Sequence, residues 1–384
     1  MKKNKIILLT VFTLFILILS CTKKNNFIGF DENIDSYVID TTITNSINYI
    51  KSYKDSILNY HNNSDLIVGK FNDIEVRTLL KFKNLPDTSW IDSVTINSCE
   101  IILKKHYLFN SDFNIKVYEL NNNWEENTVI WDSINFEGMT ELVDFLTNED
   151  TISFSIDTIL VKNWIESDTT NYGIIFEAEN LDSNFVEFYS SYTDDYPSLR
   201  IVFTGISTSK MDTITYKVSE DTFIGFDSTF FYSNILDYEQ IGNLSPTRTI
   251  ISVNLDSLAN AISPTLVELE KISINLAELI FDSTMIANSL VLNSYLGVRP
   301  YYISDTINIE YEFINGTVTS EFYQHKEFKI NITGIVQGQI RKYLDNNQIL
   351  LKSTTENKDF SYIRFVENKT PHLHIIYTKP IIDY

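Results

Sequence analysis

Cysteine, glycine and proline are all scarce in this chain of 384 residues. It has two cysteines and no Cys-x-x-Cys pair, so neither a disulfide framework nor a redox motif of that kind is expected. Glycine (11) and proline (7) are few, and neither a Gly-rich phosphate loop nor a nucleophile elbow is present. The chain therefore carries no recognisable catalytic motif, and we do not expect an enzyme.

Basic residues are outnumbered as well, because 30 lysines and arginines stand against 51 acidic residues and give a formal net charge of -21. If Lys2, Lys3 and Lys5 are removed with a signal segment, the net charge of the remaining chain is about -24. So acidic a protein repels nucleic acids and other polyanions. We expect no nucleic-acid partner, and neutral glycans or basic proteins are better matched to this charge.

The N-terminus has the features of a secretory signal. The three lysines precede an apolar run of fourteen residues, Ile6 to Leu19, which is too short to span a bilayer comfortably. The next residues, Ile18-Leu19-Ser20-Cys21, resemble the lipobox of bacterial lipoproteins, in which the signal peptide (1–20) is removed and Cys21 is lipidated. The alternative is an ordinary signal peptide followed by an accidental cysteine.

Lipidation of Cys21 predicts a protein of the cell envelope, held on the outer membrane by acyl chains such as palmitate. Cys99 would then have no disulfide partner. Residues 21–46 are expected to be the lipidated N-terminus and a tether. Surface-export signals of Bacteroidota lipoproteins are typically acidic after the cysteine, whereas Lys23 and Lys24 follow here. This favours the periplasmic side, and the sequence leaves the surface side open.

The rest of the chain is rich in residues that favour β-strands. Tyr (22) and Phe (25) are numerous, and Ile, Val and Thr recur in short runs separated by Asn, Asp, Ser and Thr. This spacing predicts an all-β protein of antiparallel β-sandwiches with a few short helical turns.

Matching segments recur at nearly one spacing, which indicates two tandem copies of one module. The matched pairs are Arg77 and Arg248 at 171 residues, Phe185 and Phe360 at 175, Pro197–Phe203 and Pro371–Tyr377 at 174, and Ile156–Trp164 and Ile332–Ile340 at 176. In the last pair the apolar residues have helical spacing, so we expect a short helix against each sandwich.

The repeat predicts two β-sandwich domains, at 47–205 and 211–378, and a C-terminal tail at 379–384. The boundary is expected at Gly205–Lys210, where small polar residues follow a closing strand. The pentapeptide Phe27–Asp31 recurs as Phe223–Asp227 but does not follow the same spacing.

The order of motifs in the first copy resembles the DNRLRE family of extracellular β-jelly-roll modules. The matching stretches cover most of residues 50–204: Leu66–Gly69, Arg77–Phe82, Leu85-Pro86, Trp124–Trp131, Val161–Trp164, Asn171–Gly173 and Pro197–Phe203. The second copy keeps the framework but lacks the Trp-x-Glu-x-x-x-x-Trp stretch, and Ile340 stands in place of Trp164. The resemblance implies a secreted, glycan-associated module, and some members bind acidic polysaccharides such as alginate. The acidity of this chain opposes that particular ligand.

Aromatic residues are the candidate glycan contacts. Trp124 and Trp131, with Tyr189, Tyr192 and Tyr196, would form a platform on which sugar rings stack. Tyr192 and Tyr196 lie in a polar loop, so we expect them to be exposed. The alternative for the tryptophans is burial inside the sandwich.

Arg77 and Arg248 lie in strongly apolar strands. A buried guanidinium requires a carboxylate or carbonyl partner. Because the arginine recurs in both copies, we predict a structural ion pair in each copy rather than a ligand contact.

Calcium is the one metal for which the sequence offers candidates. The adjacent acids Asp194 and Asp195, with Glu125 and Glu126, would suit an extracellular calcium site, although no calcium-loop spacing is present. Chance pairing among 51 acidic residues is the alternative.

The histidines give no clear metal site. His372 and His374 alternate along the last strand and share a face, but Ser198 and Arg200 stand at the matching positions of the first copy. A solvent-facing row is therefore favoured. His61, His106 and His325 have no partner at helical or strand spacing.

A short triplet, Asp-Ser or Asp-Thr followed by an aliphatic residue or Thr, occurs twelve times, beginning at Asp40, Asp55, Asp92, Asp132, Asp150, Asp157, Asp168, Asp212, Asp227, Asp256, Asp282 and Asp305. It is similar to the acceptor of periplasmic O-glycosylation in Bacteroidota, and we hypothesise that a minority are modified. The alternative is structural, because Asp ends turns and Thr opens strands.

Together these patterns predict a non-catalytic envelope lipoprotein that binds a glycan or serves as a surface scaffold. The first alternative is a structural lipoprotein that docks another envelope protein through strand edges or its acidic surface. The second is a carbohydrate-active enzyme, which would need convergent acids, His or Tyr in a cleft.

Overall fold

The computed structural model describes residues 37–55, 61–167, 169–179, 183–229, 235–262, 269–292, 295–323 and 327–379. The predicted signal peptide, Cys21, the copy of the pentapeptide at 27–31 and residues 380–384 of the predicted tail lie outside these ranges. Within them the protein is mostly antiparallel β-strand with few helices, which confirms the all-β prediction. No helix in the described ranges is long and apolar enough to cross a membrane.

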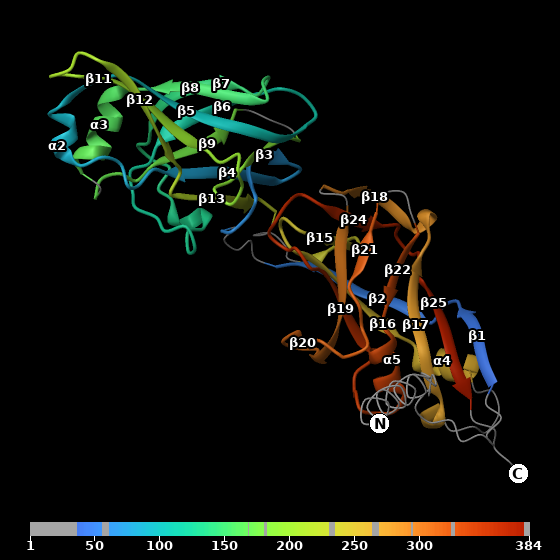
Figure 1. Ribbon diagram of the computed structural model, residues 1–384. Helices are drawn as coiled ribbons and strands as arrows, with labels where there is room; N and C mark the ends of the chain where they lie inside the picture. Colours follow the sequence, from blue (N-terminus) through green and yellow to red (C-terminus); the bar gives the residue numbers. More distant parts are fainter. Residues whose placement is uncertain are drawn as a thin grey trace, which may run out of the picture.

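The strands form two domains, and Figure 1 shows them as separate groups. The first domain contains β3 (Asp65–Phe71), β4 (Ile74–Lys81), β5 (Val94–Phe109), β6 (Asn114–Glu119), β7 (Thr140–Leu146), β8 (Thr151–Ile156), β9 (Ile174–Ala178), β10 (Asn184–Tyr189), β11 (Ser198–Gly205), β12 (Met211–Lys217) and β13 (Glu220–Asp227).

The second domain combines the beginning of the chain with its C-terminal part. It contains β1 (Tyr37–Ile43), β2 (Ile47–Lys54), β14 (Ile235–Leu236), β15 (Gln240–Gly242), β16 (Thr247–Val253), β17 (Ser273–Phe281), β18 (Ile286–Leu290), β19 (Leu296–Asp305), β20 (Glu310–Glu312), β21 (Ser320–Phe322), β22 (Phe328–Asn331), β23 (Gln348–Ser353), β24 (Tyr362–Phe365) and β25 (His372–Lys379).

Short helices lie between the strands: α2 (Thr88–Ile91), α3 (Thr158–Glu166), α4 (Leu255–Ile262), α5 (Thr333–Ile340) and the single turns η1 (Trp131–Ser133), η2 (Leu269–Lys271) and η3 (Ser283–Met285). α3 and α5 occupy the two segments predicted to be helical from their spacing. The side chain of Asp157 begins α3 by accepting a hydrogen bond from the Ile159 N–H. Trp164 then packs in the core, stacked on Phe82 with ring centroids 6.4 Å apart.

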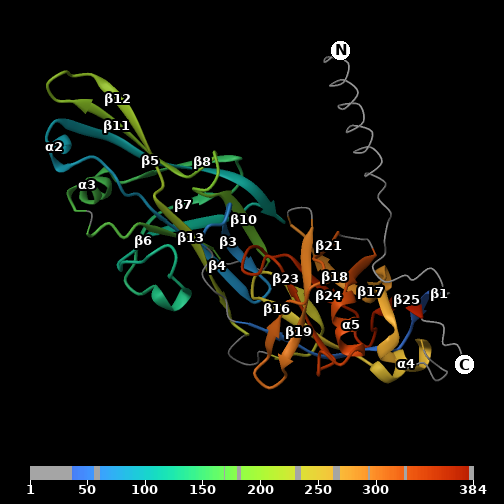
Figure 2. The ribbon, with the colours of Figure 1, turned by 60° about the horizontal axis from the view of Figure 1, so that its bottom comes forward.

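The first two strands belong to the second domain. β1 pairs with β25 along its whole length, and β2 pairs with β16. Figures 1 and 2 both show these blue strands beside the orange and red ones. The expected tether at 21–46 thus contains strand β1, and β2 lies outside the domain predicted at 47–205.

The first domain is completed in turn by strands from beyond its predicted end. β12 pairs with β11, and β13 pairs with β4. The two exchanges have the same register. Arg77 faces Ile224, and Arg248 faces Tyr53. Arg248 follows Arg77 by 171 residues in the sequence, and Ile224 follows Tyr53 by the same number. The predicted boundary at 205–210 therefore marks where the sequence repeats, but it lies within the hairpin of β11 and β12. The chain passes between the domains after Asp55 and after Thr229.

Gly69 and Gly242 occupy equivalent positions, from which the other residues of the two domains can be aligned. Gly69 faces Phe185, and Gly242 faces Tyr362. A side chain at Gly69 would meet Asn184 O at 2.3 Å, and the φ of +143° also requires glycine. Phe185 thus corresponds to Tyr362, so the spacing of 175 that paired it with Phe360 is wrong by two residues.

The domains touch through a set of apolar side chains, here called the interdomain cluster: Ile67, Phe71, Val76, Phe185, Phe223, Leu244, Leu292 and Phe360. The rings of Phe185 and Phe360 have centroids 4.5 Å apart, and those of Phe71 and Phe360 are 5.4 Å apart. Because these rings come from both domains, separating the domains would expose them to water.

Candidate functional site

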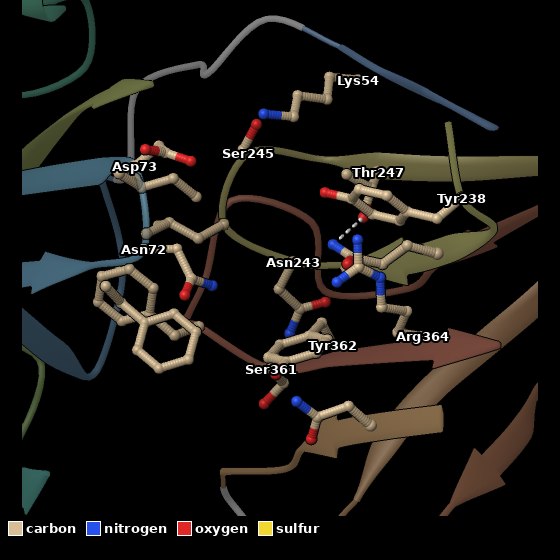
Figure 3. A pocket seen from close by; sticks show the side chains of 17 residues that line it. Lys54, Asn72, Asp73, Tyr238, Asn243, Ser245, Thr247, Ser361, Tyr362 and Arg364 are labelled. Carbon is tan, nitrogen blue, oxygen red and sulfur yellow. Dashed lines mark hydrogen bonds between the residues drawn. The ribbon is translucent and has the colours of Figure 1, made fainter. Parts of the chain in front are cut away.

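A crevice of about 400 Å³ lies between the domains beside the interdomain cluster. The turn between β3 and β4, residues 71–74, forms one wall. The segment from Tyr238 through β15 to the start of β16, together with β24, forms the other. Figure 3 shows Asn72 and Asp73 on one side and Tyr238 with Arg364 on the other. A concave site at a domain interface is a common place for a small ligand.

The crevice combines aromatic rings with amides and hydroxyls. Phe71, Phe360, Tyr238 and Tyr362 contribute the rings, and burial raises the pKa of the Tyr362 hydroxyl above its usual range, so it remains a neutral donor. The guanidinium carbon of Arg364 lies 3.3 Å from the centre of the Tyr238 ring. This contact is a cation–π interaction, and it holds the arginine and the tyrosine as one unit.

Some polar side chains of the crevice are hydrogen-bonded within the protein, and others are not. Asn243 donates to Asp359 Oδ1 at 2.7 Å, and Gln240 donates to Thr247 Oγ1 at 3.3 Å, the dashed line in Figure 3. These bonds hold the wall in place. Asn72, at the tip of its turn, makes no side-chain hydrogen bond with another described residue and is exposed.

The positive charges of the crevice are unequal. Lys54 donates to Asp227 Oδ2 at 2.7 Å and is neutralised by it. Burial alone would raise the pKa of Asp227, but hydrogen bonds from Lys54, Ser245 and Thr229 outweigh it and lower that pKa. Arg364 has no carboxylate within ion-pair distance in the described ranges. Its charge is therefore available to a ligand.

The acids of the crevice are too few for glycoside hydrolysis by the usual pair of carboxylates. Asp73 is the one carboxylic acid among the described residues that line it. The arrangement can stack a ring and hydrogen-bond its substituents, whereas a general acid opposite a nucleophile or base is not formed.

Trp124, a predicted glycan contact, is buried at 4% exposure. Its indole N–H donates to Tyr172 O at 2.7 Å, and Lys81 Nζ lies 4.5 Å from the ring centre. Trp124 therefore presents no face to a sugar, as in the alternative that assigns it to the core. Trp164 is also buried, and Trp131 stacks on Phe226 at 5.3 Å.

The three predicted tyrosines lie in the first domain and do not line the crevice. Tyr192 is 52% exposed and donates to Glu126 Oε1 at 3.2 Å. Lys217 Nζ lies 4.5 Å from the centre of the exposed Tyr196 ring. Tyr189 stacks on His106 at 4.8 Å. The structure thus exposes Tyr192 and Tyr196 but does not bring Trp124 to them as a platform.

Both predicted arginines have carboxylate partners. Arg77 pairs with Glu75 at 2.8 Å and Glu177 at 2.7 Å. Arg248 pairs with Asp55 at 2.6 Å and Glu356 at 2.7 Å. Neither lines the crevice, and each forms ion pairs of the predicted kind.

Two of the four acids considered for calcium have other partners. Asp195 pairs with Lys104 at 2.7 Å, and Glu126 accepts from Tyr192. Neither Asp194 nor Asp195 belongs to a group of three metal-ligating side chains in the described ranges. His374 contacts Asp40 through Nε2 at 2.7 Å and Glu278 through Nδ1 at 3.6 Å, so its two neighbours lie at opposite nitrogens.

Several aspartates of the repeated triplet have local structural contacts. Asp157 and Asp282 each accept a backbone hydrogen bond at the start of a helical turn, and Asp305 accepts one from the Ile307 N–H. These contacts are those of the structural alternative, in which the aspartate forms a turn.

No family model matches this chain. No curated protein matches it either. The DNRLRE resemblance therefore remains a prediction from the motifs.

Lys54, Tyr238, Asn243 and Arg364 were not anticipated from the sequence. Lys54 lies far from the others in the chain, and no spacing relates them. The one available signal is the repeat itself, because Tyr238 and Arg364 stand at positions equivalent to Asp65 and Glu187 of the first domain, counted from the paired glycines.

Proposed function

We propose that this protein is a non-catalytic, lipid-anchored envelope protein that binds a glycan in the interdomain crevice. The observation that carries the proposal is the concave site in which Tyr238, braced by Arg364, lies on the opposite side of the crevice from Asn72. Rings that stack and amides that hydrogen-bond are the means by which proteins hold sugars without reacting with them.

The charge of the chain narrows the glycan class. A net charge of -21 opposes polyanions, whereas Arg364 supplies one local positive charge inside the crevice. A neutral glycan, or one with an occasional carboxylate, is compatible with both the negative net charge of the chain and the positive charge of Arg364. The single acid Asp73 supports binding without hydrolysis.

The test is an array of neutral and acidic polysaccharides probed with the chain from residue 22. Tyr238→Ala should weaken binding to the glycan that the wild type recognises by about 10-fold, which is ~1.4 kcal/mol. Tyr343→Ala is the matched control, because Tyr343 is 78% exposed and does not line the crevice.

Three outcomes would contradict the proposal. Binding to no glycan, together with co-purification of an envelope protein, would favour the docking alternative. Equal loss in Tyr238→Ala and Tyr343→Ala would place any glycan elsewhere. Release of reducing ends from the bound glycan would indicate a carbohydrate-active enzyme.

The location forms a separate part of the proposal and rests on the lipobox-like residues before Cys21. Cys21→Ala should move the protein from the membrane to the soluble envelope fraction. A protein that stays membrane-bound in this variant would contradict lipid anchoring. Protease treatment of intact cells distinguishes the two sides of the membrane, because only a surface-exposed protein would be digested.

A further inference from the structure

Three potential metal ligands converge on the face of the first domain that is directed towards the second. Asp65 begins β3, His106 lies on β5 and Glu187 lies on β10. His106 Nδ1 is 2.6 Å from Asp65 Oδ1 and 3.9 Å from Glu187 Oε2. All three ligand atoms lie within 4.8 Å of one another. The described ranges contain no other such group of three.

A β-bulge brings His106 into this group. Glu187 pairs with Tyr107 while Phe188 pairs with Lys105, so His106 is the extra residue between them. Leu103 and Leu108 consequently pack on the same core although they are five positions apart, a spacing that would put them on opposite faces of a regular strand. Bulges of this kind re-aim a side chain and are frequent beside functional sites. Tyr189, stacked on the imidazole, fixes its orientation.

Glu187 is a buried acid with an unsatisfied carboxyl oxygen. It is 2% exposed, and its Oε1 has no hydrogen-bond partner among the described residues. Such a buried carboxyl calls for an explanation, and a cation beside it would supply one.

We propose that Asp65, His106 and Glu187 bind a divalent transition metal of the Zn²⁺ type. One imidazole nitrogen and two carboxylate oxygens suit zinc, whereas calcium and magnesium prefer oxygen alone. Bonds of about 2.0–2.2 Å place tetrahedral ligands roughly 3.3 Å apart. The observed separations of 2.6 and 3.9 Å lie on either side of this value, so small side-chain rotations suffice.

The surroundings complete the site. Asp65 Oδ2 accepts a hydrogen bond from Ser64 Oγ at 2.7 Å, the kind of outer contact that orients a ligating carboxylate. The His106 side chain is 34% exposed while the two acids are buried, so the metal enters from the histidine side. The three protein ligands leave one coordination position for water or a ligand oxygen.

The second domain lacks these ligands at the same places. Counted from Gly242 and Tyr362, the equivalents of Asp65 and Glu187 are Tyr238 and Arg364. The equivalent bulge lies between Ile286 and Asn288 and carries Ala287. The proposal therefore predicts one metal per chain, in the first domain.

The test is calorimetric titration of Zn²⁺ alone into the chain from residue 22, with metal content measured after dialysis. We expect one equivalent to bind. His106→Ala and Glu187→Gln should each weaken this site by more than about 100-fold, since loss of groups that only orient ligands already costs 10- to 100-fold. Glu187→Gln preserves side-chain size, so it separates loss of a ligand from loss of folding.

His374→Ala is the matched control, because His374 also has two carboxylate neighbours but at different nitrogens. It should bind Zn²⁺ like the wild type. Co²⁺ should give the intense visible absorption of a four-coordinate site in the wild type and not in Glu187→Gln. Absence of stoichiometric Zn²⁺ binding would overturn the proposal. So would unchanged affinity in folded His106→Ala and Glu187→Gln, or loss of the site in His374→Ala.

Discussion

The two domains share a framework and differ at the face where they meet. Each contains a glycine opposite an aromatic residue, Gly69 with Phe185 and Gly242 with Tyr362. Each also receives two strands from the other copy of the sequence repeat, β12 and β13 in the first domain and β1 and β2 in the second. These shared features determine the backbone.

The side chains on that backbone have opposite chemistry. Asp65 and Glu187 make the face of the first domain acidic, while Tyr238 and Arg364 make the equivalent face of the second domain aromatic and basic. A duplicated module has thus kept the residues that set strand register, and other positions on the same strands have diverged. We infer that one scaffold provides a metal site on one side of the interface and a glycan site on the other.

The exchange of strands predicts the largest effects. Ile47 on β2 packs in the core of the second domain, and Ile224 on β13 packs with Leu79 of the first. Replacing either with Ala should destabilise its domain by about 2–5 kcal/mol. Hydrogen exchange should show β16 and β25 loosened by Ile47→Ala, and β4 and β11 loosened by Ile224→Ala. If Ile47→Ala instead loosened the first domain and Ile224→Ala the second, each copy of the repeat would keep its own strands.

Asp227 links the two domains and gives the next effect. It is buried and accepts from Lys54 and Ser245, both of the second domain. Asp227→Asn leaves Lys54 without its charge partner and should cost about 3 kcal/mol. Thermal unfolding monitored by calorimetry measures this, and Asp73→Asn is a control because Asp73 forms no ion pair with another described residue.

Asp227 also predicts the pH dependence. Its hydrogen bonds keep its pKa below the ordinary 3.8, so the ionised form stabilises the folded protein above that value. This contribution should be lost as the pH falls from about 4 through the lowered pKa. Asp227→Asn should flatten the midpoint temperature over that range. An equally steep acid loss in the variant would show that other carboxylates are responsible.

The equivalent arginines provide a smaller contrast. Arg248 has one buried partner, Glu356 at 11% exposure, besides the exposed Asp55 at 44%, whereas Glu75 and Glu177 beside Arg77 are 34% and 29% exposed. Because solvent screens exposed charges, Arg248→Ala should cost about 2 kcal/mol and Arg77→Ala about 1 kcal/mol. Urea unfolding of the two variants compares them directly, and a larger loss for Arg77→Ala would contradict the argument from burial.

Much of this comparison was accessible from the sequence. The strand-rich composition predicted an all-β protein, and the spacing of Ile156–Trp164 and Ile332–Ile340 predicted the two short helices. The exchange was not predicted, because a repeat in sequence does not state which copy each strand pairs with. Tyr37–Lys54 was therefore divided between a tether and the first domain.

The sites were less accessible for a related reason. His106 has no partner at strand spacing, because its ligand neighbours come from two other strands and a bulge turns it towards them. The crevice joins Lys54 to Arg364 across almost the whole chain. One signal in the sequence could have indicated the metal site. Glu187 lies between the apolar residues Val186 and Phe188, and a charged residue in an apolar strand indicates a role other than packing.

The smallest predicted effect concerns the exposed loop. Tyr192→Ala should change stability by less than about 0.5 kcal/mol, because the ring is largely in solvent. Chemical unfolding measures this, and a loss above about 1 kcal/mol would show that the contact with Glu126 is more important than its exposure suggests.

The most direct test of the central claim is calorimetric titration of the recognised glycan into the wild type, Tyr238→Ala and Tyr192→Ala. The crevice account predicts weaker binding by about 10-fold in Tyr238→Ala and unchanged binding in Tyr192→Ala. The reverse pattern would move the glycan site from the interface of the two domains to the exposed loop of the first, and would contradict the account.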